Sequence, residues 1–353
     1  MTAFEDLLTW RESSTSGEAI AAALDAASRA PAGAVALLDS AERIVVTGAG
    51  SSYYLAQSVA AVARAVLGRT VVATPLSEVI LRPEGVLVSA RGAGREPVVI
   101  ISRSGSTSEA VTVAEQMRDA GRQTIAVTCR ADSPLASVAG VTLVSRAGDE
   151  EAIVMTRSFA SMLALLLGVV AGVGRDESLA ADLALAPERW QESAAAAMVG
   201  RRLGATDWSR VVVLGGGPAF GIAAEWGLKL TETSQVPTNA YEPLEFRHGP
   251  ISVCEPGMLV VGLVGGAGAG EEVAVVEEAA RLGATTWVIA RDEDEARDAS
   301  GEVSLIGGGL HPAARLPLLV HPAHALALGL ALMRGRDPDA PRHLGQVVIL
   351  GRE

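Results

Sequence analysis

Four hydroxyl side chains and one glycine are concentrated in the stretch SRSGST at residues 102–107. The apolar run PVVII precedes it at 97–101, and the stretch SEAVTVAEQMRDAG follows it at 108–121. The apolar run is typical of a buried strand, and the spacing of apolar residues in the later stretch predicts a helix. The hydroxyl-rich stretch therefore joins the carboxyl end of a strand to the amino end of a helix.

This junction has the chemistry of a phosphate-binding loop. Unpaired N–H groups and the positive end of the helix dipole favour anions at a helix N-terminus. Ser102, Ser104, Ser106 and Thr107 add hydroxyl donors, and Gly105 lets the backbone approach a ligand closely. The alternative is ordinary N-capping, which needs only one Ser or Thr. Four hydroxyls in six residues exceed that need, so we favour a phosphate site.

The glycine-rich turns elsewhere in the chain do not match a nucleotide-binding pattern. GAGSS at 48–52 is followed by Tyr53, where a dinucleotide fingerprint has its third glycine, and GGGPAFG at 215–221 has Phe220 at that position. No lysine follows SRSGST at the spacing of a Walker A loop. We therefore predict no NAD.

A second group of residues with possible chemistry lies in the helical stretch GLKLTETS. Glu225, Lys229 and Glu232 have i, i+4, i+7 spacing, which places them on one face of a helix. On spacing alone, however, a solvated stripe of ion pairs is the favoured interpretation.

The elements that position these residues occur twice along the chain. RIVVTGAGSSYYLAQSVAAV begins at Arg43 and RVVVLGGGPAFGIAAEWGLKL begins at Arg210, and each reads as strand, glycine-rich turn and helix. Three further strands follow each of them in matched order: 97–102, 124–129 and 141–145 in the first half, and 258–264, 285–290 and 302–306 in the second.

Strands that alternate with helices and are continuously apolar predict parallel sheets with helices on both faces. We therefore expect an α/β protein with two tandem, doubly wound, flavodoxin-like domains at residues 20–175 and 188–335. A helix at about 2–12 precedes them, and a C-terminal tail follows at 336–353. Ligands of such sheets bind beyond the carboxyl ends of the strands, which is where SRSGST lies.

Composition narrows the class of partner and compartment. The 353 residues are 49% hydrophobic, and the net charge of −12 argues against a nucleic-acid or anionic membrane surface. We expect Cys129 and Cys254 to be buried free thiols, since their spacing suggests no metal site. The uncharged run at 158–174 fits a buried core helix better than a membrane span, and the N-terminus lacks the pattern of a signal peptide. We expect a cytoplasmic protein.

Several motifs together resemble one family. A strand followed by GAGSSY, a strand followed by SRSGST, then EEAIVMTRSF, LKLTE, EFRHGP and DAPRHLGQ occur in that order. In this order they resemble the tandem sugar isomerase (SIS) domains, over residues 20–350. The likeness is greatest to the isomerase half of glucosamine-6-phosphate synthase and to stand-alone amino-sugar-phosphate deaminases, isomerases and deglycases.

The resemblance implies a role for individual residues. It implies that a hexose 6-phosphate is bound by Ser102, Arg103, Ser104 and Thr107, with Ser51 and Ser52 near the sugar hydroxyls and the phosphate. It makes Glu232 the base that moves a proton between C1 and C2, and it gives Lys229 the role of balancing its charge. It makes His248 a ring-opening residue that reaches the active site of the neighbouring subunit, so a homodimer is expected. It implies no metal and no organic cofactor.

Three positions depart from the family pattern. Arg103 stands where the family has glutamine, and its side chain either adds charge toward the phosphate or points to solvent. Arg157 replaces a lysine, so the charge is kept without the nucleophilicity. Gln346 replaces the tail lysine that forms a Schiff base with the open-chain ketose, and glutamine forms no imine.

Three hypotheses follow for the function. The first is a phosphosugar isomerase or amino-sugar-6-phosphate deaminase that works through an enediol or enolamine. The second is a deglycase that cleaves the C–N bond of an amino-acid–sugar phosphate adduct, for which Gln346 matters less. The third is a non-catalytic sugar-phosphate sensor. No glutaminase domain is visible in this sequence, so we expect no release of ammonia from glutamine.

Overall fold

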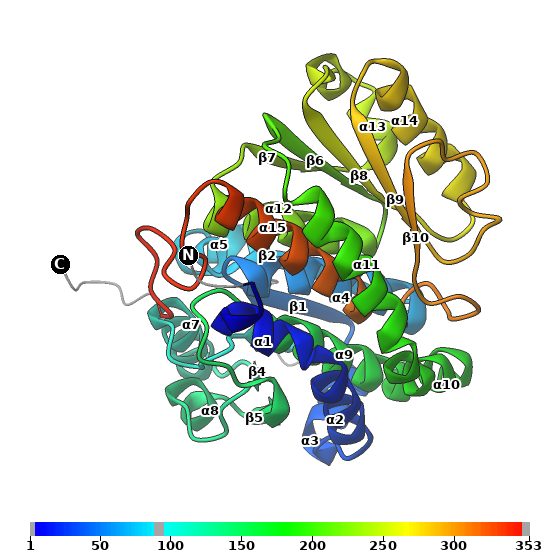
Figure 1. Ribbon diagram of the computed structural model, residues 1–353. Coiled ribbons are helices and arrows are strands. Elements are labelled where there is room, and N and C mark those ends of the chain that lie inside the picture. The colour runs from blue at the N-terminus through cyan, green and yellow to red at the C-terminus, as the bar shows by residue number, and fades with distance from the viewer. Residues whose placement is uncertain (1–3, 88–94, 348–353) are drawn as a thin grey trace. The chain divides into compact units, whose positions relative to one another are not determined.

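Parallel strands and connecting helices alternate along the chain (Figure 1). The computed structural model describes residues 4–87 and 95–347. These residues divide into two compact units. The first unit comprises the described residues of Glu18–Glu151, Arg157–Ala184 and Gly345–Glu353, and the second comprises those of Met1–Gly17, Ala152–Thr156 and Leu185–Leu344.

The first unit contains a five-stranded parallel sheet with the order β2-β1-β3-β4-β5. Its strands are β1 (Arg43–Gly48), β2 (Thr70–Pro75), β3 (Val98–Ile101), β4 (Thr124–Thr128) and β5 (Val141–Val144). Its helices are α2 (Ser16–Ser28, whose first two residues are grouped with the second unit), α3 (Ala32–Ser40), α4 (Ser51–Leu67), α5 (Leu76–Leu81), α6 (Pro83–Val86), α7 (Ser108–Asp119), α8 (Pro134–Val138), η3 (Arg146–Gly148), α9 (Arg157–Gly174) and α10 (Glu177–Leu185, whose last residue is grouped with the second unit).

Both faces of this sheet are covered, as continuous apolar strands require. Val98 and Ile100 of β3 join a buried cluster with Val113 of α7. Val99 and Ile101 alternate with them and therefore point to the opposite face, where they are also buried. The register pairs Val45 of β1 with Val98 of β3, so the carboxyl ends of these two strands are neighbours.

The second unit contains a parallel sheet of the same topology, with the order β10-β9-β8-β6-β7. Its strands are β6 (Arg210–Gly215), β7 (Thr238–Tyr241), β8 (Met258–Leu263), β9 (Thr285–Ala290) and β10 (Glu302–Leu305). Its helices are η1 (Phe4–Asp6), α1 (Leu8–Ser14), η4 (Ala186–Arg189), α11 (Trp190–Leu203), α12 (Ala219–Ser234), α13 (Pro243–Phe246), η5 (Pro250–Val253), α14 (Ala269–Arg281), η6 (Leu316–Leu319) and α15 (His321–Met333).

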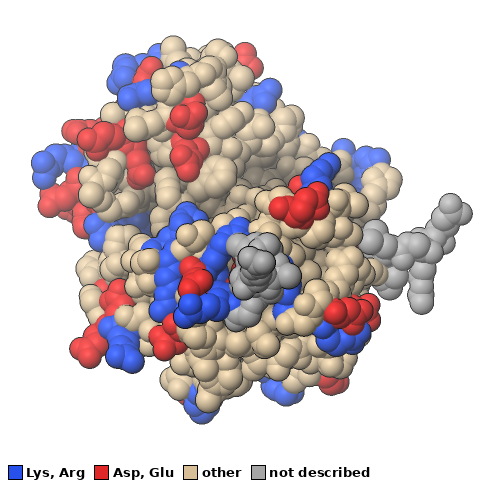
Figure 2. Space-filling view, turned by 180° about the vertical axis from the view of Figure 1, so that it is seen from behind, with Lys and Arg blue, Asp and Glu red and all other residues tan. Residues whose placement is uncertain are grey.

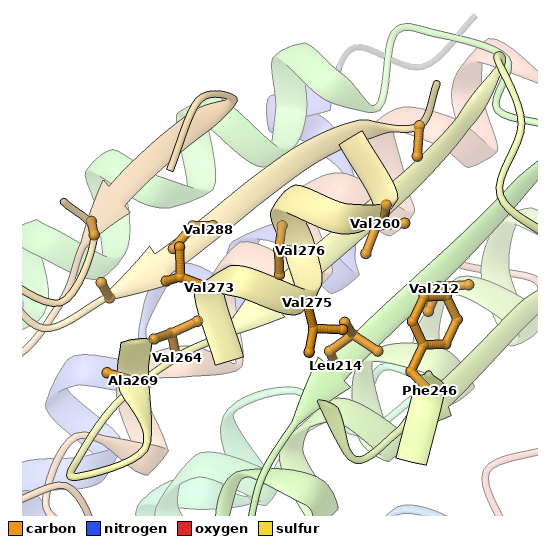
Figure 3. Packing of buried hydrophobic residues seen from close by; sticks show 14 of the residues in the cluster. Val212, Leu214, Phe246, Val260, Val264, Ala269, Val273, Val275, Val276 and Val288 are labelled. Carbon is orange, nitrogen blue, oxygen red and sulfur yellow. The ribbon is translucent and has the colours of Figure 1, made fainter. Parts of the chain in front are cut away.

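Figure 3 shows the core on one face of this second sheet. Val212, Val260 and Val288, from three neighbouring strands, pack against Val273 and Val276 of α14. The cluster is almost entirely aliphatic, so its stability comes from close packing and removal of apolar area from water.

The two parallel sheets confirm the predicted fold class, but one edge strand in each sheet was not predicted. The strands β2 and β7 lie at sheet edges and are only partly buried. The predicted helix at 2–12 is a short 3-10 turn from Phe4 followed by α1, which ends at Ser14.

The long apolar stretch that was expected to be a core helix is α9. Arg157–Gly174 and Leu316–Met333 are both long and apolar enough to cross a membrane, and a bent pair, α2 with α3, also passes such a test. However, 78% of the first and 83% of the second stretch is buried inside the protein, as a core helix would be. Of the two free cysteines, Cys129 is buried as expected, whereas Cys254 is only partly buried.

Charges of both signs occur over the molecular face seen in Figure 2, where Lys and Arg side chains gather in one area. In the first unit, ion pairs such as Arg82 with Glu78 and Arg95 with Glu42 join exposed side chains. Exposed pairs of this kind contribute little to stability, because water and salt screen them.

Candidate active site

The hydroxyl-rich stretch forms a tight loop between β3 and α7 in the first unit. The Ser102 N–H donates to the Val127 carbonyl at 3.0 Å, and the Gly105 carbonyl accepts from the Leu135 N–H at 2.9 Å. Gly105 has a φ of +62°, and a Cβ at this position would lie 2.1 Å from Ser133 Oγ. Only glycine fits both the left-handed backbone and the close approach.

The hydroxyls of this loop are not used for ordinary capping of α7. Thr107 is the N-cap residue, yet its side chain makes no capping hydrogen bond. Its Oγ1 instead accepts from Ser102 Oγ at 3.3 Å, and Ser104 Oγ accepts from the Ser106 N–H at 3.1 Å. The capping alternative is therefore not realised by Thr107, and the loop clusters its hydroxyls beside a helix N-terminus. We name residues 102–107 the cradle loop.

The serines of the first glycine-rich turn begin a helix at the neighbouring strand. Ser51 and Ser52 open α4, directly after β1, and both are buried. A Cβ at Gly48 would lie 2.5 Å from the backbone of Ser52, so glycine lets α4 start close to the strand end. Because β1 and β3 are adjacent, this turn and the cradle loop flank the point where the strand order reverses. Ligands bind there in open α/β sheets.

The structure excludes one of the two orientations considered for Arg103. Its side chain is buried, so it does not point to solvent. Arg103 Nη1 lies 3.2 Å from Glu150 Oε1, and Nη2 donates to the Gln346 carbonyl at 3.0 Å. The Glu150 carboxylate also accepts from the Ser158 hydroxyl and, at 3.3 Å, from the Ser158 N–H. The guanidinium is thus turned toward an internal acid and the tail.

Gln346 is held against the same segment by its own side chain. Its Nε2 donates to the Glu150 carbonyl at 3.0 Å and to the Glu151 carbonyl at 3.3 Å. Arg157, the other departure from the family pattern, donates from Nε to the Asp149 carbonyl at 2.9 Å. Within the first unit, Gln346 and Arg103 therefore fasten the start of the tail to the cradle loop and to residues 149–151.

The carboxylate and ammonium groups of α12 lie in the second unit and are not a solvated stripe. The side chains of Lys229 and Glu225 are 1% and 0% exposed, and that of Glu232 is 19% exposed. Lys229 Nζ lies 3.5 Å from Glu225 Oε1 and donates to Glu232 Oε2. A buried ammonium group needs such partners. The Glu232 carboxylate is therefore partly exposed and is fixed by a hydrogen bond from the buried ammonium group of Lys229.

His248 also lies in the second unit, in the exposed turn between α13 and η5. Its N–H donates to the Glu245 carbonyl at 3.0 Å, and Gly249 follows with a φ of +133°. The predicted residues are therefore divided: the second unit holds Lys229, Glu232 and His248, and the first holds Ser51, Ser52, Ser102, Arg103, Ser104, Thr107 and Gln346.

The second sheet has a strand-order reversal as well, and there the protein's own carboxylates occupy the backbone donors. Glu272 Oε2 accepts from the Gly265 N–H at 3.1 Å, and Glu295 Oε1 accepts from the Gly266 N–H at 2.9 Å. A Cβ at Gly216 would lie 2.4 Å from Glu272 Oε1. The pKa of Glu272 is raised to about 7, mainly by burial and further by the charge of Glu295, while the Gly265 hydrogen bond and Arg315 act in the opposite direction. Sequence reasoning did not find this group.

The raised pKa of Glu272 predicts a pH-dependent stability. Between its ordinary value of 4.5 and about 7, the folded protein binds a proton that the unfolded chain has lost. The free energy of unfolding therefore falls as the pH rises through this window. Glu272→Gln lacks this proton uptake. The free energy of unfolding of the variant should therefore increase relative to that of the wild type by about 1–2 kcal/mol between pH 5 and pH 8, after discounting for partial solvent screening. Urea unfolding at several pH values measures the difference.

Glu271→Gln is the matched control, since Glu271 is the exposed neighbour of Glu272 on α14. Its stability difference from the wild type should change much less over the same range, because the charge of Glu271 is the smallest contribution to the raised pKa of Glu272. An equally small change for Glu272→Gln would contradict the buried titration.

A buried cluster of Ser13, His321 and His324 was also not found from the sequence. Ser13 Oγ lies 2.7 Å from His321 Nδ1 and 2.6 Å from His324 Nδ1. Within residues 4–87 and 95–347, no three His, Cys, Asp or Glu side chains are grouped so that they would hold a metal ion.

Comparison with known proteins places these features in a family context. The family model described as SIS domain matches residues 37–172 and 206–300. The glutamine–fructose-6-phosphate aminotransferase [isomerizing] of Pyrobaculum aerophilum is 29% identical over 322 residues, which is 87% of this chain and 51% of that protein. The corresponding enzyme of Aeropyrum pernix is 29% identical over 341 residues, 89% of this chain and 52% of that protein. The chain thus spans about half the length of these relatives.

Solved structures resemble the chain over nearly its whole length. The glucosamine-6-phosphate deaminase of Thermotoga maritima is 26% identical, with a TM-score of 0.77 over 97% of this chain and 99% of that one. The tagatose-6-phosphate ketose/aldose isomerase of Escherichia coli has a TM-score of 0.83 over 100% and 98% of the two chains. At 21% identity, this second likeness concerns the fold alone.

Proposed function

The chain belongs to the SIS domain family, and from this premise we propose that it is a phosphosugar isomerase or amino-sugar-6-phosphate deaminase. The substrate is a hexose 6-phosphate, and the reaction moves a proton between C1 and C2. The observation that carries the proposal is the Glu232 carboxylate, partly exposed and held by the buried Lys229. The names of the relatives, which include an aminotransferase and a deaminase of hexose 6-phosphates, support it.

The two units supply different parts of this chemistry. The cradle loop of the first unit binds the phosphate through Ser102, Ser104 and Thr107, together with the N-terminus of α7. Glu232 of the second unit takes the proton from one carbon and returns it to the next, through an enediol or enolamine. Lys229 fixes the carboxylate and balances its charge. General acid–base catalysis by one such group contributes about 10²–10⁴-fold to the rate.

Gln346 limits the route by which the sugar ring opens. The amide forms no imine, and it is engaged with the carbonyls of Glu150 and Glu151. We therefore propose that ring opening uses His248, contributed by the neighbouring subunit of a homodimer, or that the sugar enters in its open form. The exposed position of His248 fits a contribution to a second subunit. Free thiols persist in reducing compartments, which supports a cytoplasmic location.

Gln346 also favours one second candidate, a deglycase that cleaves the C–N bond of an amino-acid–sugar phosphate adduct. Such a substrate already carries its nitrogen, so the tail amine is not needed. The same phosphate site and the same base would serve it.

Proton NMR in D₂O tests the function directly. The protein is incubated in turn with fructose 6-phosphate, glucose 6-phosphate and glucosamine 6-phosphate, and the C1 and C2 proton signals are followed. We expect one of these signals to disappear with one of the substrates, and that substrate identifies the reaction. Saturable binding of all three without any exchange would refute the isomerase and deaminase, and would direct attention to adducts.

A further inference from the structure

The N-terminal helix α1 is tied to three separate segments of the second unit. Asp339 accepts from the Leu8 N–H at 2.7 Å and from the Thr9 N–H at 2.9 Å, so a carboxylate from the C-terminal segment caps the helix. Glu12 accepts from the Ala152 N–H at 2.9 Å. Ser13 bonds to α15. A seven-residue helix with so many fixed partners is well suited to hold its neighbours in place.

The Ser13 hydroxyl restricts the tautomers of two histidines. It lies within hydrogen-bond distance of both Nδ1 atoms and can donate only one proton. At least one ring must therefore donate its Nδ1–H to Ser13, because the single hydroxyl proton can reach only one of the two Nδ1 atoms. His321 is further held between the rings of Trp10 and Trp190, whose centroids lie 4.9 and 4.8 Å from its own.

His324 is the ring that donates to Ser13. Among the described residues, its Nε2 has no hydrogen-bond partner, and the residue is only 2% exposed. A buried N–H without a partner is rarer and less favourable than a buried acceptor without one. His324 therefore carries its proton on Nδ1 and leaves the Nε2 lone pair bare. Burial lowers the pKa of His324 well below its ordinary value, and the charges of His321 and Lys229 add to this, so the ring is neutral.

The packing of α15 against α12 brings His324 to the level of Lys229. Trp226 Nε1 donates to the Leu319 carbonyl at 2.8 Å, and Thr233 Oγ1 lies 3.4 Å from the Ala327 carbonyl. The two helices thus run in the same direction with a fixed register. Lys229 lies about one turn from each of these α12 residues, which places it opposite the segment between Leu319 and Ala327 that contains His324.

A neutral ring with a bare lone pair is the favourable neighbour for a buried ammonium group. A protonated ring there would repel Lys229, and an N–H pointing toward it would oppose the charge. The same ammonium group holds Glu232. The charge interaction between His324 and Lys229 therefore links the ring to the carboxylate through one intervening side chain.

We propose that Ser13 and His324 are positioning residues for the Glu232 base: α1, through the Ser13 hydroxyl, holds the His324 ring in one tautomer against Lys229. The inference rests on the proposed function, because it assigns these residues a purpose in the same proton transfer. The proposal gives α1 a role in positioning the base, in addition to its packing against the core.

Ser13→Ala tests this, with Ser193→Ala as the matched control. Ser193 is equally buried in the second unit, and its hydroxyl donates to the Leu318 carbonyl at 2.6 Å without bonding either histidine. Ser13→Ala loses two buried hydrogen bonds and Ser193→Ala loses one, so both variants should have a lower melting temperature than the wild type. Only Ser13→Ala should lower kcat for the C1–C2 exchange, by about 10- to 100-fold with KM unchanged, as expected when a reacting group is misplaced. Ser13→Thr, which keeps the hydroxyl, should restore most of kcat.

The outcomes separate the inference from the function on which it rests. Wild-type protein without exchange on any substrate would refute the proposed function. Wild-type exchange with kcat unchanged in Ser13→Ala, or with KM alone changed, would overturn the positioning role. If Ser13→Ala does not fold, Ser13→Cys replaces it, since the thiol is only a weak hydrogen-bonding group and should lower kcat in the same direction.

Discussion

Glu232→Gln lowers the rate of C1–C2 proton exchange by about 10²–10⁴-fold, while the Kd of the sugar phosphate stays within a few-fold of the wild type. Glutamine has nearly the shape of glutamate and can still accept the hydrogen bond from Lys229. It cannot accept a proton from carbon. Exchange of the C1 and C2 protons in D₂O measures the rate, and calorimetric titration measures the affinity.

Glu278→Gln is the control for this experiment. Glu278 pairs with Arg247 at 2.7 Å on the surface of the same unit, so the variant removes a carboxylate and an ion pair without touching α12. Its exchange rate should equal that of the wild type. Exchange that survives in Glu232→Gln would remove Glu232 from the role of base, and equal loss in both variants would point to a general effect of charge.

The fold could be predicted from sequence where each strand is buried on both faces. The runs that became β3, β4 and β8 are continuously apolar because helices cover both sides of the sheet. The edge strands TVVATP and TNAY have neither a continuous apolar run nor a clean alternation, since they are only partly buried. Local pattern carries the information for a central strand much better than for an edge strand.

The residue types of the site could be found from sequence, but their environment could not. The spacing of Glu225, Lys229 and Glu232 places them on one face of a helix, yet it does not say whether that face meets water or α15. Burial decides between an ion-pair stripe and a fixed base. The partner of Arg103 is 47 residues away, and the partners of Ser13 are more than 300 residues away. Such pairs are set by tertiary packing, which no local spacing encodes.

The second large effect is expected at the cradle loop, where Thr107→Val separates phosphate binding from helix capping. Valine has the shape of threonine without its hydroxyl. If Thr107 donates to the phosphate, the loss of this charge-assisted hydrogen bond weakens binding by about 1.5–3 kcal/mol, or about 10- to 150-fold in Kd. Stability should change little, because the Thr107 side chain makes no capping bond to α7.

Asp176→Ala shows what the loss of a true cap does in the same unit. Asp176 Oδ1 accepts from the Leu179 N–H at 2.9 Å at the start of α10, so this variant should lose about 1 kcal/mol of stability and keep its affinity. Calorimetric titration with glucosamine 6-phosphate and thermal unfolding are measured on both variants. The reverse pattern for Thr107→Val, with lower stability and unchanged Kd, would mean that the hydroxyls of the loop serve the helix and that the phosphate binds elsewhere. Weaker binding with unchanged stability would show that the Thr107 hydroxyl serves the ligand, because capping of α7 does not require this hydroxyl.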